Sequence, residues 1–168
     1  MKPIHYAGAA VVLAALAGAG WQALHTSAPP APVVDYTLLD GSRHSSAQWR
    51  GQVTLVNFWA TSCTTCVKEM PEIVATHEKF KARGLDTVAV AMSYDPPAYV
   101  VNFAETRKLP FKVAIDNTGV VAKSFGNVQI TPTTLVINKR GEIVKRYVGE
   151  PDFAQLHALL EKLLAESA

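Results

Sequence analysis

Cysteine is scarce in this chain, with two residues among 168, and charged residues make up only 18% of it. So few cysteines exclude a small domain that is held together by several disulfides. The formal charge of +2 comes from 16 basic and 14 acidic residues, and no block of Lys or Arg stands out, so nucleic acid is not an expected partner. A glycine-rich loop for a nucleotide, flavin or phosphate is also missing, and we therefore expect no cofactor.

The residues that are present divide the chain into three parts. Lys2 precedes an apolar run over residues 6–24, close to the ~20 residues needed to span a bilayer. Residues 1–26 are interpreted either as a cleaved signal peptide or as an uncleaved membrane anchor, and both interpretations export the rest of the chain. Residues 27–32, rich in Pro and Ala, are expected to form a linker. Residues 33–168 are long enough for one globular domain.

Strands and helices are expected to alternate along this domain. The segment 53–58 is β-prone throughout, as in a strand buried on both faces of a mainly parallel sheet. Further strands are expected at 33–39, 87–92, 111–115, 133–138 and 143–148, and helices at 63–83, 97–107, 120–125 and after Asp152. This order predicts an α/β fold with one central mixed β-sheet flanked by helices.

The sequence Cys63-Thr-Thr-Cys66 lies where the strand 53–58 runs into the following helix. At a helix N-terminus, the positive end of the helix dipole and the unpaired amides stabilise a thiolate, here at Cys63. The three-residue spacing brings both side chains to one helical face, where they can form a disulfide. The pair therefore predicts thiol–disulfide exchange, in which Cys63 attacks a partner's disulfide and Cys66 resolves the mixed disulfide.

A structural disulfide and a metal site are the other uses of such a cysteine pair. A bridge that closes so small a loop constrains the unfolded chain little. A zinc site needs four ligands, and no second pair at ligand spacing accompanies this one, so we expect no metal. Copper held by two thiolates and a distant histidine is harder to exclude. The histidines are scattered, and each is expected at the surface rather than on a metal: His5, His25, His44, His77 and His157.

The segment Phe58-Trp-Ala-Thr-Ser-Cys-Thr-Thr-Cys66 resembles the active site of the thioredoxin superfamily. A second segment, Ile130-Thr-Pro-Thr-Thr134, is similar to the family's cis-proline loop, which offers backbone groups to an extended substrate peptide. The resemblance implies that Thr131 and Pro132 bind substrate. It also implies that Trp59 lies beside the site as a substrate contact, with core packing as the alternative.

Within the superfamily, the chain is most similar to the TlpA/ResA group of bacterial thiol:disulfide oxidoreductases. This resemblance depends on the apolar N-terminus, on Leu39-Asp-Gly41 ahead of the first core strand, and on an extra segment from about Tyr94 to Thr118. It implies a thioredoxin-like fold with a redoxin-type insertion of a helix and a strand in that segment.

The chain departs from the family pattern at two positions. Ser62 stands where most relatives carry a tryptophan, and Asn57 stands where thioredoxin has an aspartate that assists proton transfer. An amide cannot titrate. In ResA-like members a glutamate three residues after the second cysteine is the acidic group near the site, and Glu69 matches that position. Glu69 is therefore expected to be catalytic as a proton-transfer group, the alternative being a solvated helix carboxylate.

The resemblance implies a monomeric periplasmic or extracytoplasmic reductase that is exported or anchored to the inner membrane. It would receive electrons from a membrane thiol donor and pass them to exported cysteine-containing proteins, including those of cytochrome c or copper-protein maturation. Direction depends on redox potential, so a disulfide oxidase or isomerase remains an alternative. A copper-binding assembly factor that uses the same thiols is another. A peroxidase is disfavoured, because a peroxidatic cysteine lies in a different local setting from a tight Cys-x-x-Cys pair.

Overall fold

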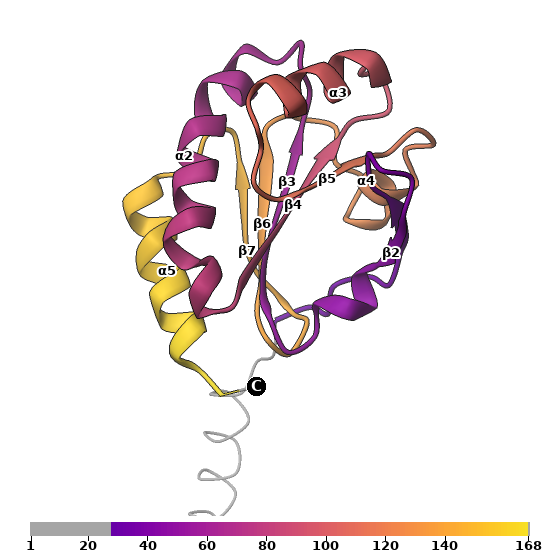
Figure 1. Cartoon of the computed structure of the whole chain (residues 1–168). Coiled ribbons are helices and arrows are strands. Elements are labelled where there is room, and N and C mark those ends of the chain that lie inside the picture. Colours follow the sequence, from indigo (N-terminus) through magenta and orange to yellow (C-terminus); the bar gives the residue numbers. More distant parts are fainter. Residues whose placement is uncertain (1–27, 168) are drawn as a thin grey trace, which may run out of the picture.

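The computed structural model describes residues 28–167, so the signal or anchor expected at residues 1–26 lies outside the described residues. No helix in the described part is both long and apolar enough to cross a membrane. The described residues form a five-stranded sheet with helices on both faces, preceded by a small two-stranded sheet (Figure 1). In chain order the elements are β1 (Asp35–Thr37), β2 (Arg43–Ser45), η1 (Ser46–Trp49), β3 (Val53–Trp59), α2 (Thr64–Phe80), η2 (Lys81–Arg83), β4 (Leu85–Ala91), α3 (Pro97–Thr106), β5 (Lys112–Ile115), α4 (Val120–Ser124), β6 (Thr133–Ile137), β7 (Ile143–Val148) and α5 (Phe153–Ala165).

The central sheet is mixed, as the sequence predicts, with the strand order β5-β4-β3-β6-β7. β3 and β4 are parallel, β4 and β5 are parallel, and β6 runs antiparallel to both β3 and β7. Phe58 near the end of β3 pairs with Thr133 at the start of β6. The residues that follow β3 and those that precede β6 therefore meet at one end of the sheet. These are the two segments that resemble the thioredoxin active site.

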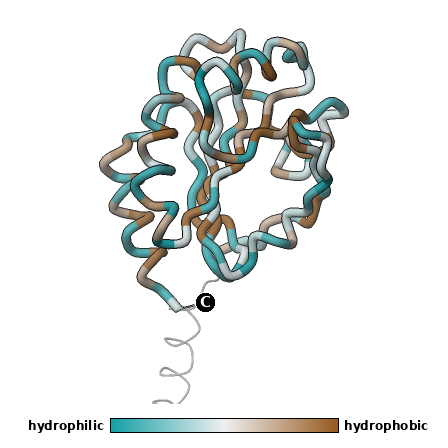
Figure 2. Tube along the Cα trace, in the orientation of Figure 1, coloured by the Kyte–Doolittle hydropathy of each residue, from teal (hydrophilic) through white to brown (hydrophobic). Residues whose placement is uncertain are grey.

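Alternate residues of β3 face opposite layers of the fold, because successive side chains of a strand point to opposite faces. Val53, Leu55 and Trp59 belong to the core under α2, α3 and α5, whereas Val56 and Phe58 belong to the core under α4 and the β1–β2 segment. Every residue of β3 is buried, which explains its continuous β-prone sequence. Figure 1 shows α2 and α5 side by side on one face of the sheet, and in Figure 2 hydrophobic and hydrophilic residues alternate along both helices, as expected for helices with one buried face.

The expected linker at residues 27–32 is instead partly built into the domain. The Ala31 amide donates to the Gly141 carbonyl over 2.8 Å, and the Ile143 amide donates to the Pro29 carbonyl over the same distance. The side chain of Ser46 also donates to the Pro32 carbonyl. Residues 29–32 thus pack onto the domain, because the carbonyls of Pro29 and Pro32 and the amide of Ala31 all find hydrogen-bond partners there. This contact lies at the β6–β7 turn, the end of the sheet away from the cysteines.

His77 corrects the expectation that the histidines lie at the surface. It is only 7% exposed in α2, its Nδ1 lies 3.1 Å from the Thr87 hydroxyl of β4, and its ring meets Phe111 edge-on. Burial lowers the pKa of His77, so this ring favours its neutral form and serves as a core residue. His5 and His25 lie outside the described residues.

Candidate active site

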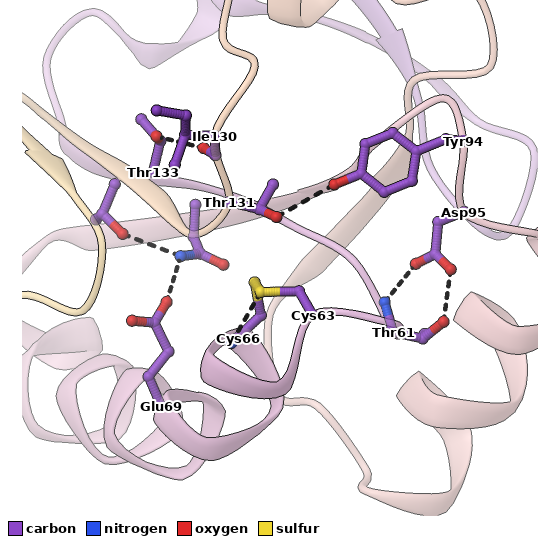
Figure 3. The surroundings of a disulfide bond; sticks show 11 residues. Thr61, Cys63, Cys66, Glu69, Tyr94, Asp95, Ile130, Thr131 and Thr133 are labelled. Carbon is purple, nitrogen blue, oxygen red and sulfur yellow. Dashed lines mark hydrogen bonds between the residues drawn. A yellow bond between two sulfur atoms is a disulfide. The ribbon is translucent and has the colours of Figure 1, made fainter.

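Cys63 is the N-cap of α2 and forms a disulfide with Cys66. The Cα atoms of the two residues are 5.2 Å apart, and the Cys66 amide donates to Cys63 Sγ over 3.1 Å (Figure 3). This bond uses one of the amides that a helix N-terminus leaves without an intrahelical partner. The first turn of α2 contains no acidic residue, so nothing there opposes a negative charge on Cys63.

The two sulfur-bearing residues differ in accessibility. Cys66 is completely buried, whereas Cys63 is half-buried and the residues next to it, Ser62 and Thr64, are exposed. An incoming molecule therefore reaches Cys63 first. This asymmetry is what a nucleophile with a sheltered resolving partner requires, and it agrees with the order of attack expected from the sequence.

The segment before β6 is a cis-proline loop, as its resemblance implies. The peptide bond between Thr131 and Pro132 is cis, and the Thr133 hydroxyl donates to the Ile130 carbonyl over 2.7 Å. Pro132 is buried, and its carbonyl accepts a bond from the Gly149 amide. Thr131 is partly exposed beside the disulfide (Figure 3), and within residues 28–167 neither its amide nor its carbonyl has a backbone partner. Those two groups are the ones available to an extended peptide.

Glu69 is fully buried one helical turn after Cys66, so the structure contradicts the alternative of a solvated carboxylate. Its Oε1 accepts a hydrogen bond from Asn57 Nδ2 over 3.0 Å, and the same amide nitrogen donates to the Thr134 hydroxyl over 2.9 Å. Asn57 reaches the helix because odd-numbered residues of β3 face the α2 side of the sheet. Glu69 Oε2 and Asn57 Oδ1 are buried without a hydrogen-bond partner in the described part of the chain.

Burial raises the pKa of Glu69 to about 7, because desolvation disfavours the carboxylate more than the Asn57 hydrogen bond favours it. The more distant negative charge of Glu150 raises the pKa of Glu69 further. A carboxyl group with a pKa near neutrality can both accept and release a proton under ordinary conditions. The geometry thus suits Glu69 to the proton-transfer role, which remains a prediction until it is measured.

Trp59 corrects the expectation of a substrate contact. Its side chain has no exposed surface and packs against Phe103 of α3, with ring centroids 5.0 Å apart. Odd-numbered residues of β3 face the helices, so the ring enters the core rather than the site. Core packing, the alternative given above for Trp59, is what the structure shows.

Two contacts near the disulfide could not be inferred from the motifs. Asp95, which follows β4, accepts from the Thr61 amide over 2.6 Å and from the Thr61 hydroxyl over 2.5 Å. Its neighbour Tyr94 places its hydroxyl 3.1 Å from Thr131 Oγ1. The signal in the sequence is that both residues follow the strand expected at 87–92 of a mainly parallel sheet, where the carboxyl ends of parallel strands lie at one edge.

Within residues 28–167, no group of three or more His, Cys, Asp and Glu side chains lies close enough together to hold a metal ion. The groups that the structure brings together at the site are the two sulfur atoms, the buried acid and the cis-proline loop. A cysteine pair at a helix N-terminus, next to a cis-proline loop on this sheet, defines a thiol:disulfide oxidoreductase of the thioredoxin superfamily.

Comparison with known proteins agrees with this class. The Redoxin family matches residues 26–160, and the chain belongs to that family. The thiol-disulfide oxidoreductase ResA of Bacillus thuringiensis subsp. konkukian is 33% identical over 133 residues, which cover 79% of this chain and 76% of the relative. ResA of Geobacillus kaustophilus is 32% identical over 133 residues, which cover 79% of this chain and 75% of the relative. The chain is thus a TlpA/ResA-like member of the thioredoxin superfamily.

Solved structures show the same fold. A solution structure described as a thioredoxin from Neisseria meningitidis is 40% identical, with a TM-score of 0.75 over 80% of this chain and 90% of that one. The crystal structure of StoA from Bacillus subtilis is 26% identical, with a TM-score of 0.65 over 76% of this chain and 96% of that one. A thiol:disulfide interchange protein described as DsbE from Chlorobium tepidum is 25% identical, with a TM-score of 0.75 over 83% of this chain and 98% of that one.

Proposed function

We propose that this oxidoreductase acts outside the cytoplasm as a reductase of disulfides in exported proteins. The observation that carries the proposal is the asymmetric pair: a half-buried Cys63 at a helix N-terminus, with Cys66 and Glu69 fully buried behind it. Export is supported by the apolar run of residues 6–24, which suits a signal peptide or an inner-membrane anchor. The name of the ResA relatives, thiol-disulfide oxidoreductase, supports disulfide exchange but does not say whether substrates are reduced or oxidised.

Reduction of a substrate would begin from the dithiol. The Cys63 thiolate attacks one sulfur of the substrate disulfide, the substrate S–S bond breaks, and the other substrate sulfur leaves as a thiolate that takes a proton. Cys66 then loses its proton and attacks Cys63 Sγ, which breaks the mixed disulfide and releases the second substrate thiolate. Two electrons pass to the substrate, and the chain is left in the disulfide form seen in the structure.

Glu69 would accept the proton that Cys66 loses. Residues three apart in a helix lie on one face, and both side chains are buried, so water is a poor competitor for this transfer. Asn57 holds the acid from the sheet side through its 3.0 Å hydrogen bond. The sequence contains two cysteines, and both take part in this exchange. We therefore propose that an external donor, a membrane thiol protein, reduces the oxidised form again.

Trapping tests the proposal most directly. A Cys66→Ser variant produced in the native host should accumulate mixed disulfides through Cys63, which mass spectrometry of the captured proteins would identify. Cys63→Ser is the matched control and should capture nothing. Exported cysteine proteins, including those of cytochrome c or copper-protein maturation, are the expected partners. If neither variant captures a protein as a mixed disulfide, disulfide exchange with exported proteins is contradicted.

The direction of exchange needs its own measurement. A reduction potential close to that of thioredoxin, about −270 mV, would make the chain a reductase, whereas a value near −120 mV would make it an oxidase. Equilibration of the purified protein with dithiothreitol or glutathione buffers, followed by thiol counting, gives this value. Copper binding by the reduced protein, together with failure to reduce a test disulfide, would favour an assembly factor instead.

A further inference from the structure

The loop after β4 touches both halves of the active site. β3 and β4 are parallel, so their carboxyl ends lie together, and the Met92 amide donates to the Trp59 carbonyl over 3.0 Å where the strands end. Beyond that point Asp95 bonds Thr61 in the loop that leads to Cys63, while Tyr94 reaches Thr131 in the cis-proline loop. Figure 3 shows these two residues on the same side of the disulfide.

Asp95 fixes the position of this loop. It is only 2% exposed, its own amide donates to the Met92 carbonyl over 2.9 Å, and both its carboxylate oxygens accept hydrogen bonds from Thr61. Hydrogen bonds to an ionised, buried acceptor are among the strongest in a protein. The backbone next to Tyr94 is therefore anchored by the hydrogen bonds of Asp95, although the Tyr94 side chain is exposed to solvent.

Tyr94 is an exposed aromatic residue whose side chain makes a hydrogen bond to the cis-proline loop. Its side chain is 56% exposed, and its hydroxyl lies 3.1 Å from the Thr131 hydroxyl. Ile130, on the other side of Thr131, is 62% exposed (Figure 3). Exposed apolar side chains that gather in one place usually mark a contact surface, and tyrosine is well suited to one because it buries a large area at little entropic cost.

Three of the six exposed large hydrophobic residues in the described part of the chain lie at or beside the cis-proline loop: Tyr94, Ile130 and Val148. Val148 is also exposed, and it pairs with Thr133 next to the cis-proline loop. A hollow of about 200 Å³ lies between Ile130, Val148 and Arg146. Thr131 thus has the Tyr94 ring on one side and the exposed Ile130 on the other (Figure 3), and the hollow next to Ile130 has a mixed polar and apolar lining. This arrangement fits an extended chain with side chains projecting to both sides.

We propose that Tyr94 is a specificity-determining residue, whose ring selects substrate polypeptides that carry an apolar side chain next to the cysteine that Cys63 attacks. The inference rests on the proposed function, in that it takes the substrate to be an extended polypeptide paired with Thr131. Its chemistry excludes glutathione as the preferred partner, because the residues on either side of the glutathione cysteine offer no apolar side chain. The apolar neighbour would be buried between the substrate backbone and the Tyr94 ring.

Two synthetic peptide disulfides and one small disulfide provide the test. The peptides differ only in the residue next to the cysteine, Leu in one and Ser in the other, and oxidised glutathione is the small disulfide. The reduced wild-type protein is compared with Tyr94→Ala, Tyr94→Phe and Tyr99→Ala by kcat/KM. Tyr99 is the matched control, because it is a similarly exposed tyrosine, 64% exposed, that lies on α3 rather than in the loop after β4.

The wild-type protein should prefer the Leu peptide by about tenfold, a ratio typical of one well-placed apolar contact. Tyr94→Ala should lose this preference, because its rate with the Leu peptide should fall much more than its rate with the Ser peptide or with oxidised glutathione. Tyr94→Phe should keep the preference because the ring remains. Tyr99→Ala should behave as the wild type. The inference is overturned if Tyr94→Ala keeps the preference, or if Tyr99→Ala loses it equally. If the wild-type protein exchanges with neither peptide, the proposed function itself fails along with the inference.

Discussion

The side-chain amide of Asn57 donates one hydrogen bond to Glu69, over 3.0 Å, and another to the Thr134 hydroxyl, over 2.9 Å. A strand residue thus connects an acid on α2 to the strand that follows the cis-proline loop. Both Asn57 and Glu69 have no exposed surface. The titratable group near Cys66 is therefore on the helix, and the non-titratable amide on the sheet holds it in place.

Replacement of Glu69 by Gln should slow the resolving step in which Cys66 attacks the mixed disulfide. Since the pKa of Glu69 is about 7, the wild-type rate should rise as pH increases through neutrality, when the acid becomes a carboxylate base. Glu69→Gln should lack this inflection and should be about 10- to 100-fold slower at alkaline pH. Stopped-flow measurement of mixed-disulfide decay checks this, with the exposed Glu72→Gln of the same helix as control. An unchanged pH profile in Glu69→Gln would contradict the proton-transfer role of Glu69.

The stability of the oxidised protein should also depend on Glu69. Its pKa rises on folding from 4.5 to about 7, so the folded state binds the proton more tightly than the unfolded state. Stability is then highest below the unfolded pKa and decreases as pH rises through the folded pKa, by about 3 kcal/mol in total. Chemical denaturation across this range should show that decrease in the wild type and in Glu72→Gln, and should show it removed in Glu69→Gln. A Glu69→Gln protein with the wild-type slope would contradict the assignment.

Replacement of Asn57 by Asp should move the Glu69 titration upward. The Asn57 amide is the group that lowers the pKa of Glu69, and Asp would both remove this donor and place a second carboxyl beside it. The pair would titrate as a unit, and the midpoint of the stability–pH curve should lie above that of the wild type. The surface substitution Asn102→Asp on α3 is the control and should leave the midpoint in place. A midpoint at or below the wild-type value would show that Asn57 does not set this pKa.

Replacement of Asp95 by Asn should destabilise the fold by about 2 kcal/mol, because the Thr61 amide and hydroxyl would lose at least one buried, charge-assisted partner. Asp40→Asn offers a close control, because Asp40 also accepts bonds from an amide and a hydroxyl, both of Ser42, but at an exposed turn. Asp40→Asn should destabilise the fold much less than Asp95→Asn, because water competes for the exposed groups of Ser42. Denaturant unfolding of the two oxidised variants gives the comparison. Equal losses would mean that burial adds nothing to the Asp95 contact.

The sequence was sufficient to predict the order of strands and helices, because the patterns are strong and local. The run 53–58 became β3, the helix starting at Cys63 became α2, and the β6–β7 hairpin lies where the turn residues indicate. The cis-proline loop lies where the family resemblance implies it. Chemistry that depends on adjacent residues, such as the cysteine pair at the helix N-terminus, was equally accessible.

Contacts between distant segments were much harder to predict. Asn57 contacts Glu69 and Trp59 enters the core because the odd-numbered residues of β3 face the side of the sheet that α2 covers. The sequence does not show which side that is. The packing of β3 against β4 decides that Asp95 reaches Thr61. Such contacts need the register and layering of the whole sheet, which local patterns do not contain. The same reason explains the buried His77, whose partners come from β4 and from the segment before β5.

The pairing of Pro29 and Ala31 with the β6–β7 turn gives the domain a polarity. The chain enters at one pole, and the reactive sulfur lies at the other, separated by the length of β3, roughly 20 Å at the usual rise of a strand. An attachment made ahead of Pro29, to a membrane, a solid support or a fusion protein, is therefore made at the end of the domain that is opposite the disulfide. With the attachment at that end, large substrate proteins can approach the disulfide from the opposite side.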